Sequence, residues 1–183
     1  MAECWGQRIH MLTTGGEFIG TFGVSGSGIG QFWGPLDVKI SPDGRVYVAD
    51  WGNHRVQVFN PDWTISHVID NSSVPGRFSY PTAIAFDLLG NVYVANDSNA
   101  VSVFTPSGQF IQHYGRDGVN TSSIAIDPSG YSLLFDRHTL SVYNPSGSLV
   151  HTIGGFKRST GVSISPDGSV WIADSNDNRL VQL

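Results

Sequence analysis

Three acid–arginine pairs share one spacing and could carry charge-based chemistry. In each pair the acid precedes the arginine by five positions: Glu3 and Arg8, Asp50 and Arg55, Asp174 and Arg179. Such a pair could bind a charged ligand, or the two side chains could pair with each other and fix a turn. We favour the second role, because the pairs recur at one phase of a longer repeat. We therefore interpret these three pairs as structural turn clamps.

The six histidines show no spacing that is typical of a metal site. His67, His113 and His151 fall in predicted outer strands, whereas His54 and His138 fall in turns of different repeats. Zinc sites need three or four ligands that converge on one point. No nucleophile motif or phosphate-binding glycine motif is present either. We therefore expect no cofactor, no metal and no enzymatic activity.

A repeat of about forty residues organises the chain. Tight turns resembling Pro-Asp-Gly place glycines at spacings of 46, 40 and 38 residues, and an apolar strand follows each of them: Gly44, Gly90, Gly130 and Gly168. Each unit contains four short segments with apolar residues at alternate positions, which is typical of strands. A period near forty with four strands per unit indicates propeller blades. We predict an all-β propeller with about four blades.

The pattern also gives approximate bounds for the blades. Complete blades are predicted over 34–69, 80–115 and 121–154, with partial blades over 1–23 and 160–183. The two ends could combine to close a four-bladed ring. Both ends would then supply a third strand, so we favour part of a larger propeller. Unpaired strand edges in such a part would favour self-association.

The segment Asp50–Phe59, with the sequence DWGNHRVQVF, resembles the core of an NHL repeat. Gly30–Pro35 and Gly76–Pro81 resemble the lead into a blade of that family, and the resemblance extends over almost the whole chain. It is nearest to the NHL domains of tripartite-motif proteins. It implies a six-bladed parent propeller that binds protein or RNA, in proteins that often carry a RING ubiquitin-ligase domain. The turns at 96–100 and 136–140 are shorter and lack the arginine.

Charge is distributed unevenly between the two edges of the predicted sheets. The first edge carries the turns between second and third strands and the loops that lead into first strands. It is neutral, whereas the second edge carries the whole net charge of −5. A polyanion would therefore have to use the first edge. Apart from the clamps, the basic residues on that edge are Arg77, Arg116, Arg137, Lys157 and Arg158.

We predict that these five basic residues and Trp51 form a partner-binding site, with a solvated polar rim as the alternative. Trp51 and Trp63 replace small or polar residues of other units, so each could contact a partner or pack locally. Our leading hypothesis is a non-catalytic module that binds a protein partner, for example a substrate recruited to a ubiquitin ligase. The alternatives are RNA binding and a propeller enzyme such as a zinc-dependent amidating lyase.

Composition limits the setting in which the chain works. Cys4 is the only cysteine, so neither an internal disulfide nor a cysteine-based zinc site can form within this sequence. No apolar run reaches the length of a membrane span, and residues 1–10 lack the features of a signal peptide. We therefore expect a cytoplasmic protein that does not bind membranes.

Overall fold

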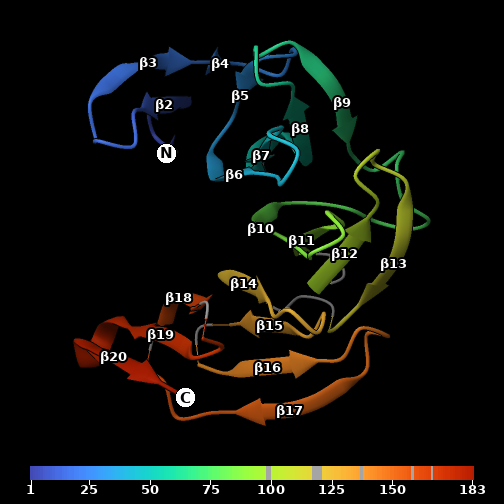
Figure 1. Ribbon diagram of the computed structural model, residues 1–183. Coiled ribbons are helices and arrows are strands. Elements are labelled where there is room, and N and C mark those ends of the chain that lie inside the picture. The colour runs from blue at the N-terminus through green and yellow to red at the C-terminus, as the bar shows by residue number, and fades with distance from the viewer. Residues whose placement is uncertain (98–99, 117–120, 137, 158, 166) are drawn as a thin grey trace. The chain divides into compact units, whose positions relative to one another are not determined.

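The computed structural model describes residues 1–97, 100–116, 121–136, 138–157, 159–165 and 167–183. The chain divides into two compact units, Met1–Pro81 and Thr82–Leu183. The described residues form five antiparallel sheets of three or four strands, each a propeller blade (Figure 1). The predicted all-β propeller is confirmed. The expected number of about four blades was too low, because the N-terminal strands form a separate sheet.

The first unit contains two of these blades. In both, consecutive strands are hydrogen-bonded neighbours. The strands of the first blade are β1 (Ala2–Glu3), β2 (Arg8–Leu12) and β3 (Phe18–Phe22). A short parallel pair follows, formed by β4 (Val24–Ser25) and β5 (Gln31–Phe32). The strands of the second blade are β6 (Pro35–Ile40), β7 (Val46–Asp50), β8 (Arg55–Phe59) and β9 (Ile65–Ile69).

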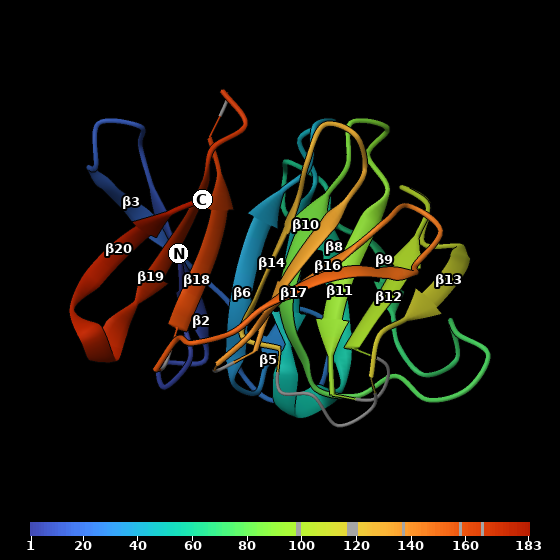
Figure 2. The same cartoon turned by 90° about the horizontal axis from the view of Figure 1, so that it is seen from below.

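The remaining strands form three blades, again in simple sequential order (Figure 2). The third blade consists of β10 (Pro81–Phe86), β11 (Val92–Asn96), β12 (Ala100–Phe104) and β13 (Phe110–Tyr114). The fourth consists of β14 (Ser123–Ile126), β15 (Ser132–Phe135), β16 (Leu140–Tyr143) and β17 (Leu149–Ile153). The fifth consists of β18 (Ser159–Ile164), β19 (Val170–Asp174) and β20 (Arg179–Gln182).

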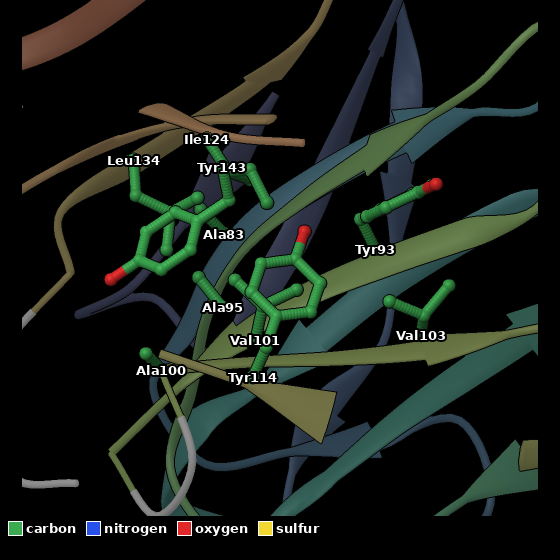
Figure 3. Close-up of a cluster of buried hydrophobic side chains, with 10 residues drawn as sticks. All are labelled: Ala83, Tyr93, Ala95, Ala100, Val101, Val103, Tyr114, Ile124, Leu134 and Tyr143. Atoms are coloured by element: carbon green, nitrogen blue, oxygen red, sulfur yellow. The ribbon is translucent and has the colours of Figure 1, made fainter. Parts of the chain in front are cut away.

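The core of each unit lies between the faces of successive sheets. In β7 and β11 every residue is buried, which matches their Val, Tyr and Ala content. In the first unit Ile9 of β2 packs with Phe32 and Phe59. In the second unit Tyr114 and Tyr143 belong to one buried cluster, which side chains from the third and fourth blades build (Figure 3).

Tight turns on the second edge have the geometry that their glycines require. Gly44 and Gly130 adopt φ of +86° and +83°, a left-handed conformation that side chains with a Cβ rarely adopt. The preceding acids stabilise these turns. For example, an Asp127 carboxylate oxygen accepts hydrogen bonds from the backbone N–H groups of Ser129 and Tyr131, both at 2.8 Å. The aspartates of the second edge therefore have structural partners in their own turns: Asp43, Asp62, Asp87, Asp127 and Asp167.

The strand registers allow the blades to be compared position by position. Asp50 pairs with Arg55, and Asp174 pairs with Arg179. The corresponding pair in the third blade is Asn96 and Ala100. In the fourth blade Phe135 pairs with Leu140, so Asp136 faces Thr139, and its N–H donates to the Thr139 carbonyl at 3.0 Å.

Within the described ranges, no helix is long and apolar enough to cross a membrane.

Candidate interaction site

Asp50 is the centre of a buried hydrogen-bond network at the end of β7. Its carboxylate is fully buried. Oδ2 accepts from Arg55 Nε at 2.8 Å and from Gln57 Nε2 at 3.2 Å, and Oδ1 accepts from the backbone N–H of Trp33 at 2.8 Å. Arg55 Nη2 also donates to the Gln31 carbonyl at 3.0 Å. The network therefore joins the turn after β7 to the loop that leads into β6.

Aromatic side chains lie next to this network at the first edge. Trp33 is 63% exposed and Trp51 is 37% exposed. The Trp51 ring lies 5.0 Å from the Tyr80 ring, which lies 4.1 Å from the His54 ring. The Tyr80 N–H also donates to His54 Nδ1 at 3.3 Å. We call these four residues, Trp33, Trp51, His54 and Tyr80, the aromatic rim.

Two glycines fix the positions of the tryptophans. The Gly52 N–H donates to the Trp33 carbonyl at 2.7 Å, and a Cβ at Gly52 would lie 2.9 Å from Trp33 Cγ. A Cβ at Gly34 would contact Trp51 Cε3 at 3.4 Å. Each indole therefore packs against backbone that has no side chain. This arrangement presents the indoles in a fixed geometry.

The other two acid–arginine pairs are also in contact. Arg8 Nε lies 2.6 Å from Glu3 Oε2, which His10 Nε2 also approaches at 2.6 Å. The hydrogen bond from Arg8 lowers the pKa of the Glu3 carboxyl. Arg179 donates to Asp174 Oδ2 through Nε at 3.1 Å and through Nη2 at 3.0 Å. Asp174, like Asp50, is fully buried.

The predicted basic residues of the binding site have different surroundings. Lys157 Nζ pairs with Asp177 Oδ1 at 2.7 Å, so its charge already has a counter-ion within the chain. The reason is that the short 3₁₀ turn Ser175–Asp177 brings Asp177 toward the loop before β18. Arg77 lies exposed in the loop before β10, and Arg116 lines a cavity. Arg137 and Arg158 lie outside the described residues.

The tryptophans at turns divide into contact candidates and packing residues. Trp63 packs 4.3 Å from the Phe22 ring and 6.0 Å from the Phe59 ring, against the core of the first unit. Trp5, in the turn after β1, is 95% exposed. Sequence reasoning missed Trp5 and Trp33 as contact candidates. A usable signal existed for Trp33, because Ser79 occupies its position in the lead into the next blade.

A polar cavity of about 230 Å³ lies beside the fourth blade, and Arg116, Thr121, Asp136 and Tyr143 are among its lining residues. Thr121 is 1% exposed, and its Oγ1 has no hydrogen-bond partner among the described residues. Burial raises the pKa of the Tyr143 hydroxyl, and the nearby Arg116 charge partly opposes that rise. The cavity therefore brings a cation, an acid and hydroxyl groups together.

In the part of the chain that the structure describes, no three His, Cys, Asp or Glu side chains gather as metal ligands. His67 is half-buried, and desolvation lowers the pKa of its imidazole. Its ring packs edge-on against Tyr47 at 6.3 Å, which is a packing role. The cavity and the aromatic rim are therefore the candidate functional features.

Sequential four-stranded antiparallel sheets of this kind define a β-propeller. Residues 32–59 match the family model described as NHL repeat, and this match includes the Asp50 network. The chain is thus a β-propeller that contains a segment matching the NHL repeat, as the sequence predicted.

Related proteins agree with this assignment. The chain is similar to "Protein brain tumor" of Drosophila melanogaster, at 25% identity over 75% of this chain and 14% of that protein. It is also similar to "Protein lin-41" of Caenorhabditis elegans, at 48% identity over 23% of this chain and 4% of that protein. The chain thus matches only a small part of the length of either relative.

A solved structure shows the same fold. It is a catalytically inactive virginiamycin B lyase from Staphylococcus aureus with quinupristin, which matches with a TM-score of 0.77. The match covers 99% of this chain and 61% of that one. Sequence identity is 14%, so the likeness concerns the fold alone.

Proposed function

We propose that this chain is a non-catalytic interaction module whose aromatic rim binds a protein partner. The observation that carries the proposal is the pair of exposed indoles, Trp33 and Trp51, held in place by a buried network. Energetic centres of protein interfaces are enriched in Trp, Tyr and Arg. An aromatic group that is fixed before binding loses less conformational entropy when a partner covers it.

The surroundings of the rim support a binding role. The Asp50 network anchors the rim through the Trp33 backbone N–H, which donates to Asp50 Oδ1 at 2.8 Å. The Trp33 and Trp51 indoles lie against the backbone of Gly52 and Gly34, where a Cβ would contact them. The resemblance to NHL domains of tripartite-motif proteins adds support, because those propellers bind protein or RNA. Recruitment of a ubiquitin-ligase substrate is the form of this function that the resemblance favours.

The test compares two pairs of exposed apolar residues on opposite edges. Trp33→Ala combined with Trp51→Ala removes the indoles of the rim. Leu88→Ala combined with Leu89→Ala is the control, because these side chains are 78% and 82% exposed in a turn of the second edge. The full chain and both variants are immobilised, and the amounts of protein that they capture are compared. Each captured protein is then purified, and its affinity for the chain and for both variants is measured directly.

We expect the tryptophan variant to lose at least about tenfold in affinity for a purified partner, which corresponds to roughly 1.4 kcal/mol. The leucine variant should bind as the wild type does. Equal binding by both variants, with unchanged far-UV circular dichroism, would reject the rim as the binding surface. Capture that disappears after ribonuclease treatment would instead identify RNA as the ligand, bound by stacking on the rim.

A further inference from the structure

The cavity beside the fourth blade exists because bulky side chains of the second blade have small counterparts there. In the second blade Arg55 faces Asp50, and Gln57 pairs with Val48. In the fourth blade Thr139 faces Asp136, and Ser141 pairs with Leu134. Thr139 and Ser141 therefore occupy the positions of Arg55 and Gln57. Both of these small residues line the cavity.

A third bulky residue is also missing from the sequence of the fourth blade. Phe32 stands three positions before Pro35, which pairs with Asp50 at the start of β6. The corresponding position, three before Thr121, is Gly118, which lies outside the described residues. The sequence thus has a glycine at the position of Phe32, and it has Thr139 and Ser141 at the positions of Arg55 and Gln57.

The acid of the clamp remains, although Thr139 occupies the position of the clamp arginine. Asp136 Oδ1 accepts from the backbone N–H groups of His138 and Thr139 at 2.9 and 2.8 Å. In the complete clamps, Oδ1 likewise accepts a backbone N–H, from Trp33 at Asp50 and from Lys157 at Asp174. In both of those clamps Oδ2 accepts the arginine. Asp136 therefore keeps the carboxylate of a clamp, but within the described residues its Oδ1 accepts N–H groups of its own turn and not of the loop before the blade.

The third blade lost its arginine in a different way. Ala100 replaces the arginine and Asn96 replaces the acid, so both charged groups of the clamp are replaced together. Asn96 is buried, and its Nδ2 donates to Ser102 Oγ at 3.1 Å. In the second to fifth blades, Asp136 is the acid whose facing position, the one that Arg55 and Arg179 hold in their blades, is occupied by a threonine.

A buried hydroxyl group indicates that the cavity takes a polar ligand. Thr121 is 1% exposed and lines the cavity, and its Oγ1 has no partner within the described part of the chain. A buried hydroxyl without a partner costs free energy that a ligand can recover by hydrogen bonding. The apolar lining residues Leu134 and Leu149 could cover the aliphatic part of the same ligand.

We propose that this cavity binds the guanidinium group of an arginine side chain that the protein partner presents. The inference rests on the proposed function as a protein-binding module and names the chemistry of the partner. The incoming guanidinium would take the place that Arg55 occupies beside Asp50, with Asp136 as its acid. Arg116 is exposed at the cavity and carries a like charge, so it weakens binding and makes a second positive group unfavourable.

The experiment uses the full chain and small probes. Nuclear magnetic resonance titration compares N-acetyl-arginine amide with its neutral isostere N-acetyl-citrulline amide and with inorganic phosphate. We expect the arginine probe to shift signals of Thr121, Thr139 and Tyr143, and the citrulline probe to bind at least about tenfold more weakly. Asp136→Asn should abolish this preference, whereas Arg116→Gln should strengthen arginine binding. Asp127→Asn, on the second edge of the same blade, should change nothing.

A second variant keeps the proposal testable if Asp136→Asn fails to fold. Thr139→Arg places the chain's own guanidinium in the cavity and leaves Asp136 intact, so the arginine probe should no longer bind. Phosphate binding that Arg116→Gln abolishes, without arginine binding, would overturn the proposal in favour of an anion site. If no probe binds while the rim tryptophans still prove necessary for partner binding, only this inference fails. If the arginine probe binds and the rim variants bind partners normally, only the proposed rim function fails.

Discussion

Asp50 at the end of β7 and Asp136 after β15 occupy the same position in two blades, but their surroundings differ. Asp50 is fully buried and accepts hydrogen bonds from Arg55, Gln57 and the Trp33 backbone. Asp136 is only partly buried, and its Oδ1 accepts two N–H groups of its own turn. The carboxylate of one blade is a structural centre, and that of the other lines a cavity.

The difference shows how one repeat can supply both a scaffold and a site. Where the arginine and glutamine are present, they fill the space beside the acid and bind the backbone of the loop that carries Trp33. Where Thr139 and Ser141 replace them, the same backbone leaves a polar cavity of about 230 Å³. The repeat geometry is therefore retained while the side chains determine the chemistry of the edge.

The largest expected effect comes from removing the two acids separately. Asp50→Ala should lower the free energy of unfolding by about 3 kcal/mol, because it leaves the partly buried Arg55 guanidinium without its counter-ion. Asp136→Ala should cost about 1 kcal/mol, since that carboxylate mainly caps backbone N–H groups. Urea denaturation followed by circular dichroism measures both. Equal losses would show that the two carboxylates have equivalent roles.

A smaller effect is expected at the glycine that supports the rim. Gly52→Ala should cost about 1–3 kcal/mol, because the new Cβ would lie 2.8 Å from the Trp33 carbonyl oxygen and force the backbone apart. Gly154→Ala is the matched control, since a Cβ there meets nothing within 4 Å. Thermal unfolding and indole fluorescence follow the two variants. A Gly52 variant with wild-type stability and fluorescence would contradict the fixed geometry of Trp33.

The repeat made most of the fold predictable from the sequence. The turn glycines such as Gly44 and Gly130 need a left-handed backbone, and the alternating apolar residues require sheets with one face toward the core. The number of blades was harder to predict, because β1 to β3 lack the first strand on which the repeat pattern depends. Short strands such as Ala2–Glu3 carry too few residues to show a period.

The candidate site was less predictable, because it depends on distances between separate loops. Trp51 was recognised because it interrupts a pattern of small residues. Trp33 was missed although Ser79 occupies its position in the next blade, and the structure places its indole against Gly52 beside the clamp. The pairing of Lys157 with Asp177 depends on the path of the loop before β18, which composition does not encode. The cavity depends on the small size of Thr139 and Ser141, and two small residues do not form a sequence motif that predicts a cavity.

The comparison can be tested further by converting the fourth blade into a copy of the second. Thr139→Arg combined with Ser141→Gln should raise the free energy of unfolding by about 1 kcal/mol, because a charge-assisted pair with Asp136 forms in a cavity with room for it. For a chain of this size, that gain corresponds to roughly 2–4 °C in Tm. Calorimetry measures the shift. A lower Tm would mean that Arg116 or the loop before β14 prevents the guanidinium from reaching Asp136.

The smallest expected effect concerns Tyr143, which stands where the second blade has Phe59. Burial raises the pKa of the Tyr143 hydroxyl above its usual value of 10.0, and Asp136 raises it slightly, whereas Arg116 and a hydrogen bond with Ser141 oppose the rise. A pKa that is higher in the folded state favours folding of the neutral form. This contribution is complete below about pH 10 and is lost as the pH rises through the folded-state pKa.

Tyr143→Phe should therefore reduce the loss of stability above pH 10 and leave stability near pH 7 almost unchanged. It should not abolish the alkaline loss, because burial also raises the pKa of Tyr93, to about 12, and that of Tyr114. Denaturation at pH 7 and above pH 10, with phenolate absorbance as a second readout, measures the change. In Arg116→Gln the phenolate transition of Tyr143 should move to higher pH, because a positive charge that favours the phenolate has been removed. A transition that stays in place would show that Arg116 does not face the Tyr143 hydroxyl, and the cavity would then lack the cation on which its charge balance depends.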